Sequence, residues 1–434
     1  MEKKHSFFDL KSEEGFPVWD ILRFSIYQKY TFPTVSHIGR NKLLLSFIYS
    51  VGLLRIFFSL FSFCFKKAPV IFFTYGRNID ENGKLFDKCC ENIIRQTDRY
   101  LIVERFRALK KYRYPIEYNF VQFYKNFSRE KVKISDEIAN KIIEALIESF
   151  GESKVTKDEL DRIYTDFIKG YTYYRFFFRL KRPEKVYFIG NGLQKGMVAA
   201  AHSLGIQIEE IQHGMFERDH LAYSYPSFIQ KRDKAVIFPD VFYTMGALWG
   251  ADVNIPTPII PVGNDYFANT SCDETPDGSI LFISSIIHEA DLSALAIDFV
   301  QKNPSISINF KLHPNEFRDE KKYIKRFAAY PNIHLLRNEI TLPVLIAKAT
   351  IVVLINSTVL YETLNQGGKV AIYKKVNYES QVGCFNHPNV YLLDGIDDLE
   401  KAYDAPKKDI KEAFFDKFDV EKFKSYAKSP HYRA

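Results

Sequence analysis

The stretch from Phe310 to Lys374 constrains the fold more than any other part of the chain. Residues 305–312 alternate between polar and apolar side chains and then become apolar, which is typical of a strand entering a sheet. The strand ends at His313-Pro314, because proline cannot continue a hydrogen-bonded ladder. His313 is therefore predicted to lie at the carboxyl edge of a strand, where open α/β sheets bind their ligands.

A second strand and a helix follow in the same stretch. Residues 350–355 form a continuous run rich in β-branched side chains, as expected for a strand buried on both faces. A helix over residues 359–366 comes next, preceded by a predicted N-cap cluster of Asn356, Ser357 and Thr358. Free N–H groups and two hydroxyls at a helix start suit a phosphate, and Glu362 lies one turn further, within reach of a ribose or a base.

Each feature alone also has an ordinary structural explanation, since strand-end histidines and Asn-Ser-Thr caps are common. Their order, however, resembles the carboxyl-terminal half of GT-B glycosyltransferases, and more narrowly the bacterial capsule and lipopolysaccharide transferases, such as sialyl-, Kdo- and polyol-phosphate transferases. The resemblance implies that a His-Pro and a Ser/Thr pair hold the nucleotide phosphates, while a Glu holds the ribose or base. The implied donor-nucleotide site consists of His313, Pro314, Asn356, Ser357, Thr358 and Glu362, with Ser284 and Ser285 at a neighbouring strand end.

The whole chain fits an α/β fold of GT-B type, with two Rossmann-like parallel-sheet domains facing a central cleft. Strands and helices alternate in the carboxyl-terminal half, which favours a parallel sheet, over residues 279–283, 289–302, 305–312, 318–328 and 332–336. Helices predicted over 396–404 and 408–427 end the chain. The predicted parts are an amino-terminal helical extension, an acceptor domain, a linker and a nucleotide-donor domain, at residues 1–67, 68–265, 266–278 and 279–434.

Strand-end loops of the acceptor domain carry further candidates. Arg77, Asp80 and Asp87 follow a predicted strand over 70–75, and Gln212-His213-Gly214 ends another over 206–211. Ionisable side chains in such loops suit an acceptor sugar or a general base, although solvated loop charges are the structural alternative. The candidate bases are Asp80, Asp87 and His213, which the pattern does not rank, and His313 is a candidate to assist the leaving phosphate. The acceptor-binding candidates are Arg77, Gln212 and Gly214.

Several classes of site find no support in the sequence. The Gly190-Asn191-Gly192 turn is not a GxGxxG motif, and no GxxxxGK[ST] motif occurs. Sixty basic and 53 acidic residues give a net charge of +7 without a long Lys/Arg block, which argues against nucleic acid. The five cysteines lack CxxC spacing, which indicates a reducing compartment and no structural metal. Without a clear DxD motif, metal-independent transfer is predicted, with no cofactor besides the nucleotide-sugar donor.

Residues 43–65 form an apolar segment with basic flanks. The segment is long enough to span a bilayer, but Arg55 at its centre would cost about 2.5–3.5 kcal/mol on the insertion scale. A helix lying on the membrane surface is therefore the preferred interpretation, at equal weight with a helix packed on the first domain and ahead of a true span. The predicted location is cytoplasmic, peripheral on the inner face of the cell membrane.

These features predict a glycosyltransferase that moves a sugar from a nucleotide-activated donor to a bacterial surface polysaccharide or lipid-linked glycan. The resemblance slightly favours a CMP-activated sugar over UDP or GDP donors. Three alternatives stay open: a CDP-polyol or sugar-phosphate transferase of the same fold, a non-catalytic polysaccharide-assembly binding protein, and a nucleotide-sugar epimerase. The sequence does not decide between retention and inversion.

Overall fold

The structure is a computed structural model whose described residues are 1–31, 66–104, 111–119, 128–216, 220–231, 236–251, 253–269, 272, 274–376, 378–381, 383–410 and 413–428. The predicted membrane-surface segment 43–65 lies outside these residues, as does the charged stretch 217–219. Among the described residues, no helix is both long enough and apolar enough to cross a membrane.

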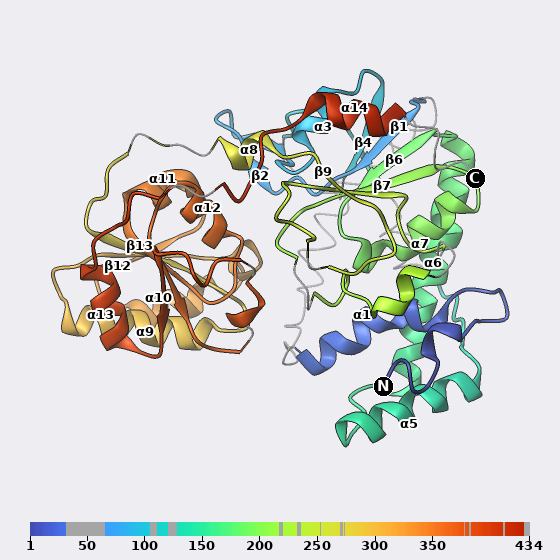
Figure 1. Cartoon of the computed structure of the whole chain (residues 1–434), viewed down its shortest axis with the longest axis horizontal. Coiled ribbons are helices and arrows are strands. Elements are labelled where there is room, and N and C mark those ends of the chain that lie inside the picture. The colour runs from blue at the N-terminus through green and yellow to red at the C-terminus, as the bar shows by residue number, and fades with distance from the viewer. Residues whose placement is uncertain are drawn as a thin grey trace.

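The first domain is built on a seven-stranded sheet in which all neighbouring strands run parallel (Figure 1). In sheet order the strands are β5 (Ile116–Tyr118), β4 (Tyr100–Glu104), β1 (Val70–Phe73), β6 (Lys185–Phe188), β7 (Gln207–Ile211), β8 (Val241–Thr244) and β9 (Ile259–Pro261). Strands β6 and β8 are buried along their whole length, as expected for a parallel sheet that is covered on both faces. A separate antiparallel hairpin pairs β2 (Asn78–Ile79) with β3 (Leu85–Phe86).

The second domain is built on a six-stranded sheet, again parallel throughout. Its strands, in sheet order, are β12 (Ile333–Leu336), β11 (Ile308–Lys311), β10 (Ser279–Ile283), β13 (Ala349–Leu354), β14 (Val370–Tyr373) and β15 (Val390–Leu393). Alternate side chains of β10 enter different cores, with Ile280 and Phe282 on one face and Leu281 and Ile283 on the other. The sheet therefore carries helices on both faces, and the predicted fold of two Rossmann-like parallel-sheet domains is confirmed.

The helices that cover these sheets begin and end largely where the caps predict. In the amino-terminal part they are η1 (Phe7–Asp9), α1 (Val18–Thr31), α3 (Glu91–Arg95), α5 (Asp136–Phe150), α6 (Lys157–Lys181), α7 (Asn191–His202), η2 (Ser227–Lys231) and α8 (Asp265–Ala268). In the rest of the chain they are α9 (Glu289–Lys302), η3 (Pro314–Glu316), α10 (Glu320–Phe327), α11 (Leu342–Lys348), α12 (Val359–Asn365), η4 (Tyr378–Ser380), α13 (Ile396–Asp404) and α14 (Val420–Lys428). Helix α6, for example, starts with a capping box formed by Thr156 and Glu159.

In both sheets the chain order reverses beside the first strand of the domain. The second sheet has the order 3-2-1-4-5-6 in terms of its own strands, with the reversal between β10 and β13. In the first sheet the reversal lies between β1 and β6. Open α/β sheets bind ligands outside the carboxyl ends of the strands at this point of reversal. The loops after these four strands are therefore where a site is expected.

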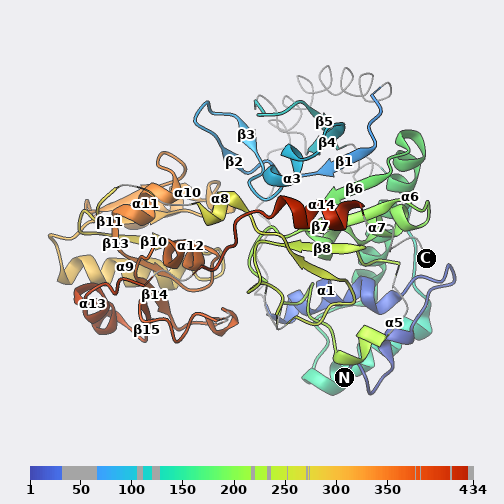
Figure 2. The ribbon, with the colours of Figure 1, turned by 45° about the horizontal axis from the view of Figure 1, so that its top comes forward.

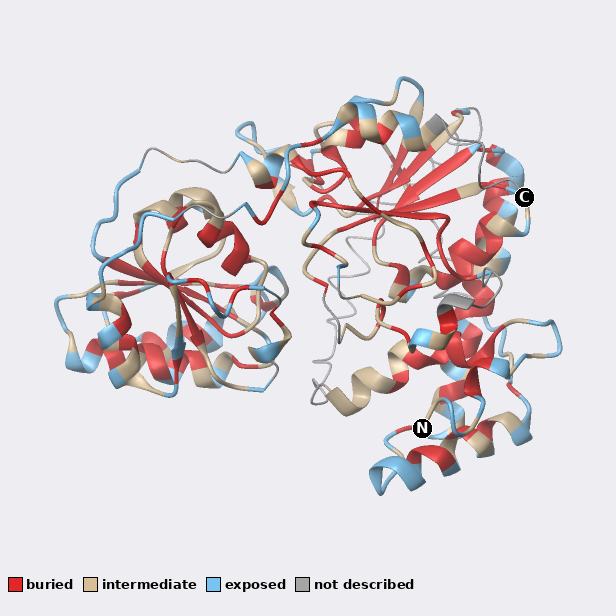
Figure 3. Ribbon diagram, viewed as in Figure 1, coloured by how far each residue is buried: buried red, intermediate tan, exposed pale blue. Residues whose placement is uncertain are grey.

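The two domains share one buried apolar cluster, so they are not independent bodies joined only by a linker (Figure 3). The Trp249 ring of the first domain lies 4.8 Å from the Tyr361 ring of the second, measured between centroids, and 5.6 Å from Phe415. Its indole N–H donates to the Phe414 carbonyl at 2.9 Å. The carboxyl-terminal segment thus passes between the domains as part of their common core.

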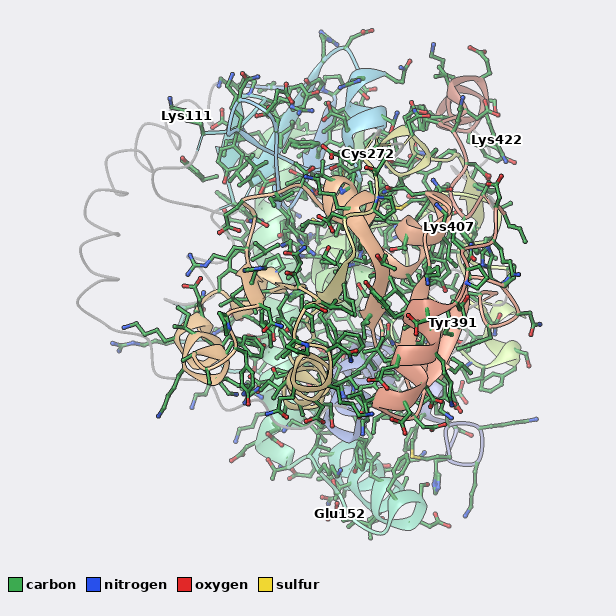
Figure 4. The ribbon with its side chains drawn as sticks, turned by 90° about the vertical axis from the view of Figure 1, so that its left-hand side faces the viewer. Lys111, Glu152, Cys272, Tyr391, Lys407 and Lys422 are labelled. Atoms are coloured by element: carbon green, nitrogen blue, oxygen red, sulfur yellow. The ribbon has the colours of Figure 1, made fainter. Side chains whose placement is uncertain are left out.

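That segment differs from the prediction of one helix over 408–427, because α14 starts only at Val420. Before α14 the backbone bonds to the first domain instead of to itself: Asp416 N–H donates to the Met245 carbonyl, and Asp419 N–H to that of Val262. Figures 1 and 2 show α14 against the first domain, and Figure 4 labels Lys422 on it and Tyr391 in β15 of the second domain. Contacts with another part of the molecule have overridden helix propensity here.

We predict that Gly263→Ala destabilises the protein by several kcal/mol, on the order of 3–5, because a Cβ at Gly263 would lie 2.1 Å from the Lys417 carbonyl oxygen. The φ angle of Gly263 is also positive, at 80°. Gly83→Ala is the matched control, since its φ is 72° but no atom lies within 4 Å of the added carbon. It should cost only about 1–2 kcal/mol. Urea unfolding measures both, and equal losses would contradict the argued contact with Lys417.

Candidate functional site

The predicted donor residues all lie at the carboxyl edge of the second sheet. Ser284 and Ser285 follow β10, His313 follows β11, and residues 356–358 join β13 to α12. Because β10 and β13 are the strands between which the chain order reverses, two of these three loops flank the expected ligand position. The structure therefore brings to one sheet edge residues that are far apart in the sequence.

The His313 turn is held by a buried carboxylate. Glu316 accepts the His313 backbone N–H at 3.0 Å through Oε2, and the Ser284 hydroxyl donates to its Oε1 at 2.9 Å. The Tyr323 hydroxyl donates to the same Oε1. Glu316 and Ser284 are 3% and 4% exposed, so this network fixes the backbone from below the surface. The Ser284 hydroxyl, predicted to contact the donor, is used here to support the turn, while Ser285 is half-buried beside it.

The start of α12 is capped by Ser357 rather than by Thr358. Ser357 Oγ accepts the Val359 N–H at 3.3 Å, and Thr358 makes no side-chain capping bond. Asn356 Nδ2 donates to the Ser380 hydroxyl, which ties the loop to η4. All three side chains of the predicted cluster are half-buried. Since α12 has seven residues, its dipole is short, and a phosphate here would depend on the side chains as well.

Glu362 faces the first domain. It is 3% exposed, and its Oε2 lies 3.6 Å from Nζ of Lys88, which belongs to the loop before α3. The Lys88 ammonium lies 4.1 Å from the centroid of the Phe267 ring. This ion pair joins the two domains at the residue predicted to hold a ribose or a base.

In the first domain, Arg77 lies beyond β1, next to the order reversal, and its side chain is exposed. Its guanidinium carbon lies 5.1 Å from the centroid of the Tyr75 ring. The Tyr75 hydroxyl accepts from Gln194 Nε2 at 2.8 Å, and the Tyr75 N–H donates to Asp87 Oδ2 at 2.9 Å. The ring under the guanidinium is therefore held from two sides.

Both candidate aspartates are engaged by backbone groups. Asp87 accepts the N–H groups of Tyr75 and Cys89 with its two oxygens, and burial raises its pKa. Asp80 accepts two N–H groups in the β2–β3 turn and pairs with Arg113 at 3.1 Å. These bonds favour structural roles for both carboxylates, one in the loop after β1 and the other in the hairpin.

The Gln212-His213-Gly214 turn follows β7 and is fixed by Gln212. The Gln212 amide donates to the Gly214 carbonyl at 2.9 Å and accepts the Met245 N–H at 2.7 Å. Gln212 is 1% exposed, so it shapes the turn, whereas a side chain at Gly214 would meet no atom within 4 Å. Burial lowers the pKa of His213 to about 4, with further contributions from Arg77 and His220. His213 is therefore neutral at pH 7 and able to accept a proton.

Arg77 links this turn to the second domain. The pKa of His313 is lowered by loss of hydration at the partly enclosed ring and then by the charges of Arg77 and Lys311, while Glu316 acts in the opposite direction. The same guanidinium contributes to the lowered pKa of His213. The structure therefore brings Arg77, His213 and His313 within electrostatic range of one another across the domain boundary. Asp80 is not part of this group.

The sequence analysis missed Glu210, the last residue but one of β7. It is fully buried, and its Oε1 accepts the Gly190 and Asn191 N–H groups at 3.2 and 2.8 Å and the Tyr223 hydroxyl at 2.6 Å. Burial raises the pKa of Glu210 to about 7, although those bonds favour its ionised form. A carboxylate thus already occupies the start of α7, where a bound phosphate would bond in a nucleotide-binding Rossmann domain. Only its position two residues before Gln212 could have signalled this.

Among the described residues, no three His, Cys, Asp or Glu side chains are grouped in a way that could hold a metal ion. Metal-independent chemistry stays a prediction.

Neither a protein-family model nor a curated protein matches the chain in sequence. Its fold is similar to UDP-GlcNAc 2-epimerase of Methanocaldococcus jannaschii in complex with UDP-GlcNAc and UDP, at 10% identity and TM-score 0.46, over 78% of this chain and 94% of that one. The corresponding values for the Neisseria meningitidis epimerase bound to UDP-GlcNAc are 11%, 0.44, 84% and 93%. Anabaena HepE in complex with UDP and glucose gives 11%, 0.42, 77% and 88%. At these values the likenesses transfer no function or site residue to this chain.

We predict that Glu210→Gln changes how stability depends on pH. The raised pKa means that ionising Glu210 disfavours the folded state, so its contribution is lost as the pH rises from about 4.5 to about 7. Gln keeps the acceptor for the three donors and removes that loss. The unfolding free energy of the variant should gain on wild type by about 1.4 kcal/mol per pH unit in this window.

Urea unfolding at several pH values between 4.5 and 8 measures the difference. Glu144→Gln, on the exposed side of α5, is the control and should show a constant difference from wild type. A constant difference for Glu210→Gln as well would contradict the raised pKa.

Proposed function

We propose that this protein is a glycosyltransferase of the bacterial capsule and lipopolysaccharide type, which moves a sugar from a nucleotide-activated donor to a surface polysaccharide or lipid-linked glycan. The observation that carries the proposal is the grouping of Arg77 and His213 with His313 across the domain boundary. A transferase of this fold needs acceptor chemistry from one sheet edge and donor chemistry from the other, and these residues supply both. The sequence resemblance narrows the class.

The donor nucleotide belongs to the second domain in this proposal. Its loops at the order reversal are open to a ligand, whereas Glu210 takes the backbone donors at the start of α7 in the first domain. Two domains with related topology would thus have different tasks. His313, Ser357 and Thr358 would bond the phosphates, and Glu362, released from Lys88, would accept from the ribose or the base. A CMP-activated sugar remains slightly favoured by the resemblance.

For the reaction we propose His213 as the base, because it is neutral and both aspartates are bonded to backbone groups. His213 accepts the proton of the acceptor hydroxyl as that oxygen bonds to the anomeric carbon. The bond from this carbon to the phosphate oxygen breaks, and the phosphate leaves with the electron pair. A hydrogen bond from His313 stabilises the charge that develops on the phosphate. The lipid-linked acceptor would be met at the cytoplasmic membrane surface, for which a net charge of +7 is suitable.

We predict that one pyrimidine nucleotide among CMP, CDP, UDP and TDP, or else GDP, raises the melting temperature of the wild-type protein. A ligand at 100 times its dissociation constant stabilises by about 2.7 kcal/mol. His313→Ala should lose this shift because the predicted phosphate contact is gone. His334→Ala, which alters an exposed histidine on the neighbouring strand β12, should keep it.

Absence of a shift with every nucleotide would contradict the donor site and favour a non-catalytic assembly protein. Once the nucleotide is known, its sugar derivatives separate the reaction types by product. Transfer releases the free nucleotide only when an acceptor is present, polyol-phosphate transfer releases CMP from a CDP-activated donor, and epimerisation needs no acceptor.

A further inference from the structure

Arg77 is a cation without a protein counter-ion. Among the described residues it forms no ion pair and no hydrogen bond, and its one defined contact is the Tyr75 ring. Neighbouring carboxylates bond elsewhere: Asp87 accepts two backbone N–H groups, and Glu104 accepts the Thr74 hydroxyl and the Gly76 N–H. The five N–H donors of the guanidinium are therefore available to a ligand.

The Arg77 side chain is also positioned in advance. Its backbone neighbour Gly76 bonds to buried Glu104 at 2.6 Å, and the Tyr75 ring beneath the guanidinium is fixed through Gln194 and Asp87. Stacking on a fixed ring limits the conformations of the arginine, so less entropy is lost when it binds an anion. An exposed arginine on a mobile chain would lack this advantage.

The position of Arg77 selects the part of the substrate it would meet. It lies beyond β1 at the order reversal of the first sheet, within electrostatic range of His213 in its own domain and His313 in the other. A group bound there lies between the proposed base and the proposed phosphate contact. That is the position of the donor's reacting end, whereas the sequence pattern predicted that Arg77 binds the acceptor.

We propose that Arg77 binds an oxyanion carried by the donor next to its reacting carbon, through the forked geometry that carboxylates and phosphates share. This proposal rests on the proposed transferase function. The oxyanion is either the phosphate of the nucleotide or the carboxylate of an acidic sugar. An anion at this position would also offset the effect of Arg77 on both histidines and raise their pKa values.

The test is isothermal titration calorimetry with CMP, UDP, UDP-N-acetylglucosamine and CMP-N-acetylneuraminic acid against four proteins: wild type, Arg77→Gln, Arg77→Lys and Arg162→Gln. Arg77→Gln should weaken binding of the oxyanion-bearing ligand about 10- to 100-fold. Arg77→Lys should weaken it less, because lysine keeps the charge and loses the fork. Arg162→Gln changes an exposed arginine of α6 and should bind as wild type does.

The ligands distinguish the two sources. If the phosphate is bound, Arg77→Gln weakens the free nucleotides as much as the nucleotide sugars. If the carboxylate is bound, only CMP-N-acetylneuraminic acid is weakened and CMP is unaffected. Unchanged affinity for every ligand overturns the proposal while leaving the transferase intact.

A second measurement covers the case in which no nucleotide binds the wild type, which would refute the proposed function. The pKa of His213, followed by NMR, should rise when pyrophosphate is added to wild type and should not change in Arg77→Gln. A rise that needs Arg77 keeps the oxyanion site without the transferase, and no rise in wild type overturns the site as well.

Discussion

Asn264 makes the set of hydrogen bonds on which the arrangement of the two domains depends. It is 2% exposed, and its backbone N–H donates to the Asp416 carbonyl at 2.8 Å. Its side-chain amide donates to the carbonyls of Lys88 and Cys89 at 3.1 and 3.3 Å, and its side-chain oxygen caps α8. One residue at the end of the first domain thus joins the returning carboxyl-terminal segment to the loop that carries Lys88. Since Lys88 reaches Glu362, the same bonds determine how close the two sheet edges lie.

The two domains show how one topology can serve different purposes. Both sheets are parallel and reverse their order beside the first strand, so both offer a carboxyl edge for a ligand. In the first domain Glu210 satisfies the donors at the start of α7 from within the protein. In the second domain Glu316 instead holds the His313 turn from beneath and leaves the imidazole at the surface. A buried carboxylate therefore blocks the ligand position in one domain and shapes it in the other.

The sequence predicted the sheets well because their signals are local. A β-branched run, a strand-ending proline and a glycine pair each act on neighbouring residues, which is why the strands around His313 and before Asn356 were found. Glu210 was missed because its role depends on Gly190 and Tyr223, which only the fold brings near. The extended stretch before Val420 was predicted as helix because its partners, Met245 and Val262, are remote in sequence. Proximity across the domain boundary leaves no periodic pattern to read.

The electrostatics of Arg77 then connect binding to proton transfer. A guanidinium without a counter-ion keeps both His213 and His313 neutral, so one is able to accept a proton and the other to donate a hydrogen bond. Once an anion neutralises Arg77, the imidazoles hold a proton more readily, which strengthens His213 as a base. By linkage, anion binding and protonation favour each other. The unpaired cation would therefore both attract the donor and adjust the basicity of the histidine that acts on the acceptor.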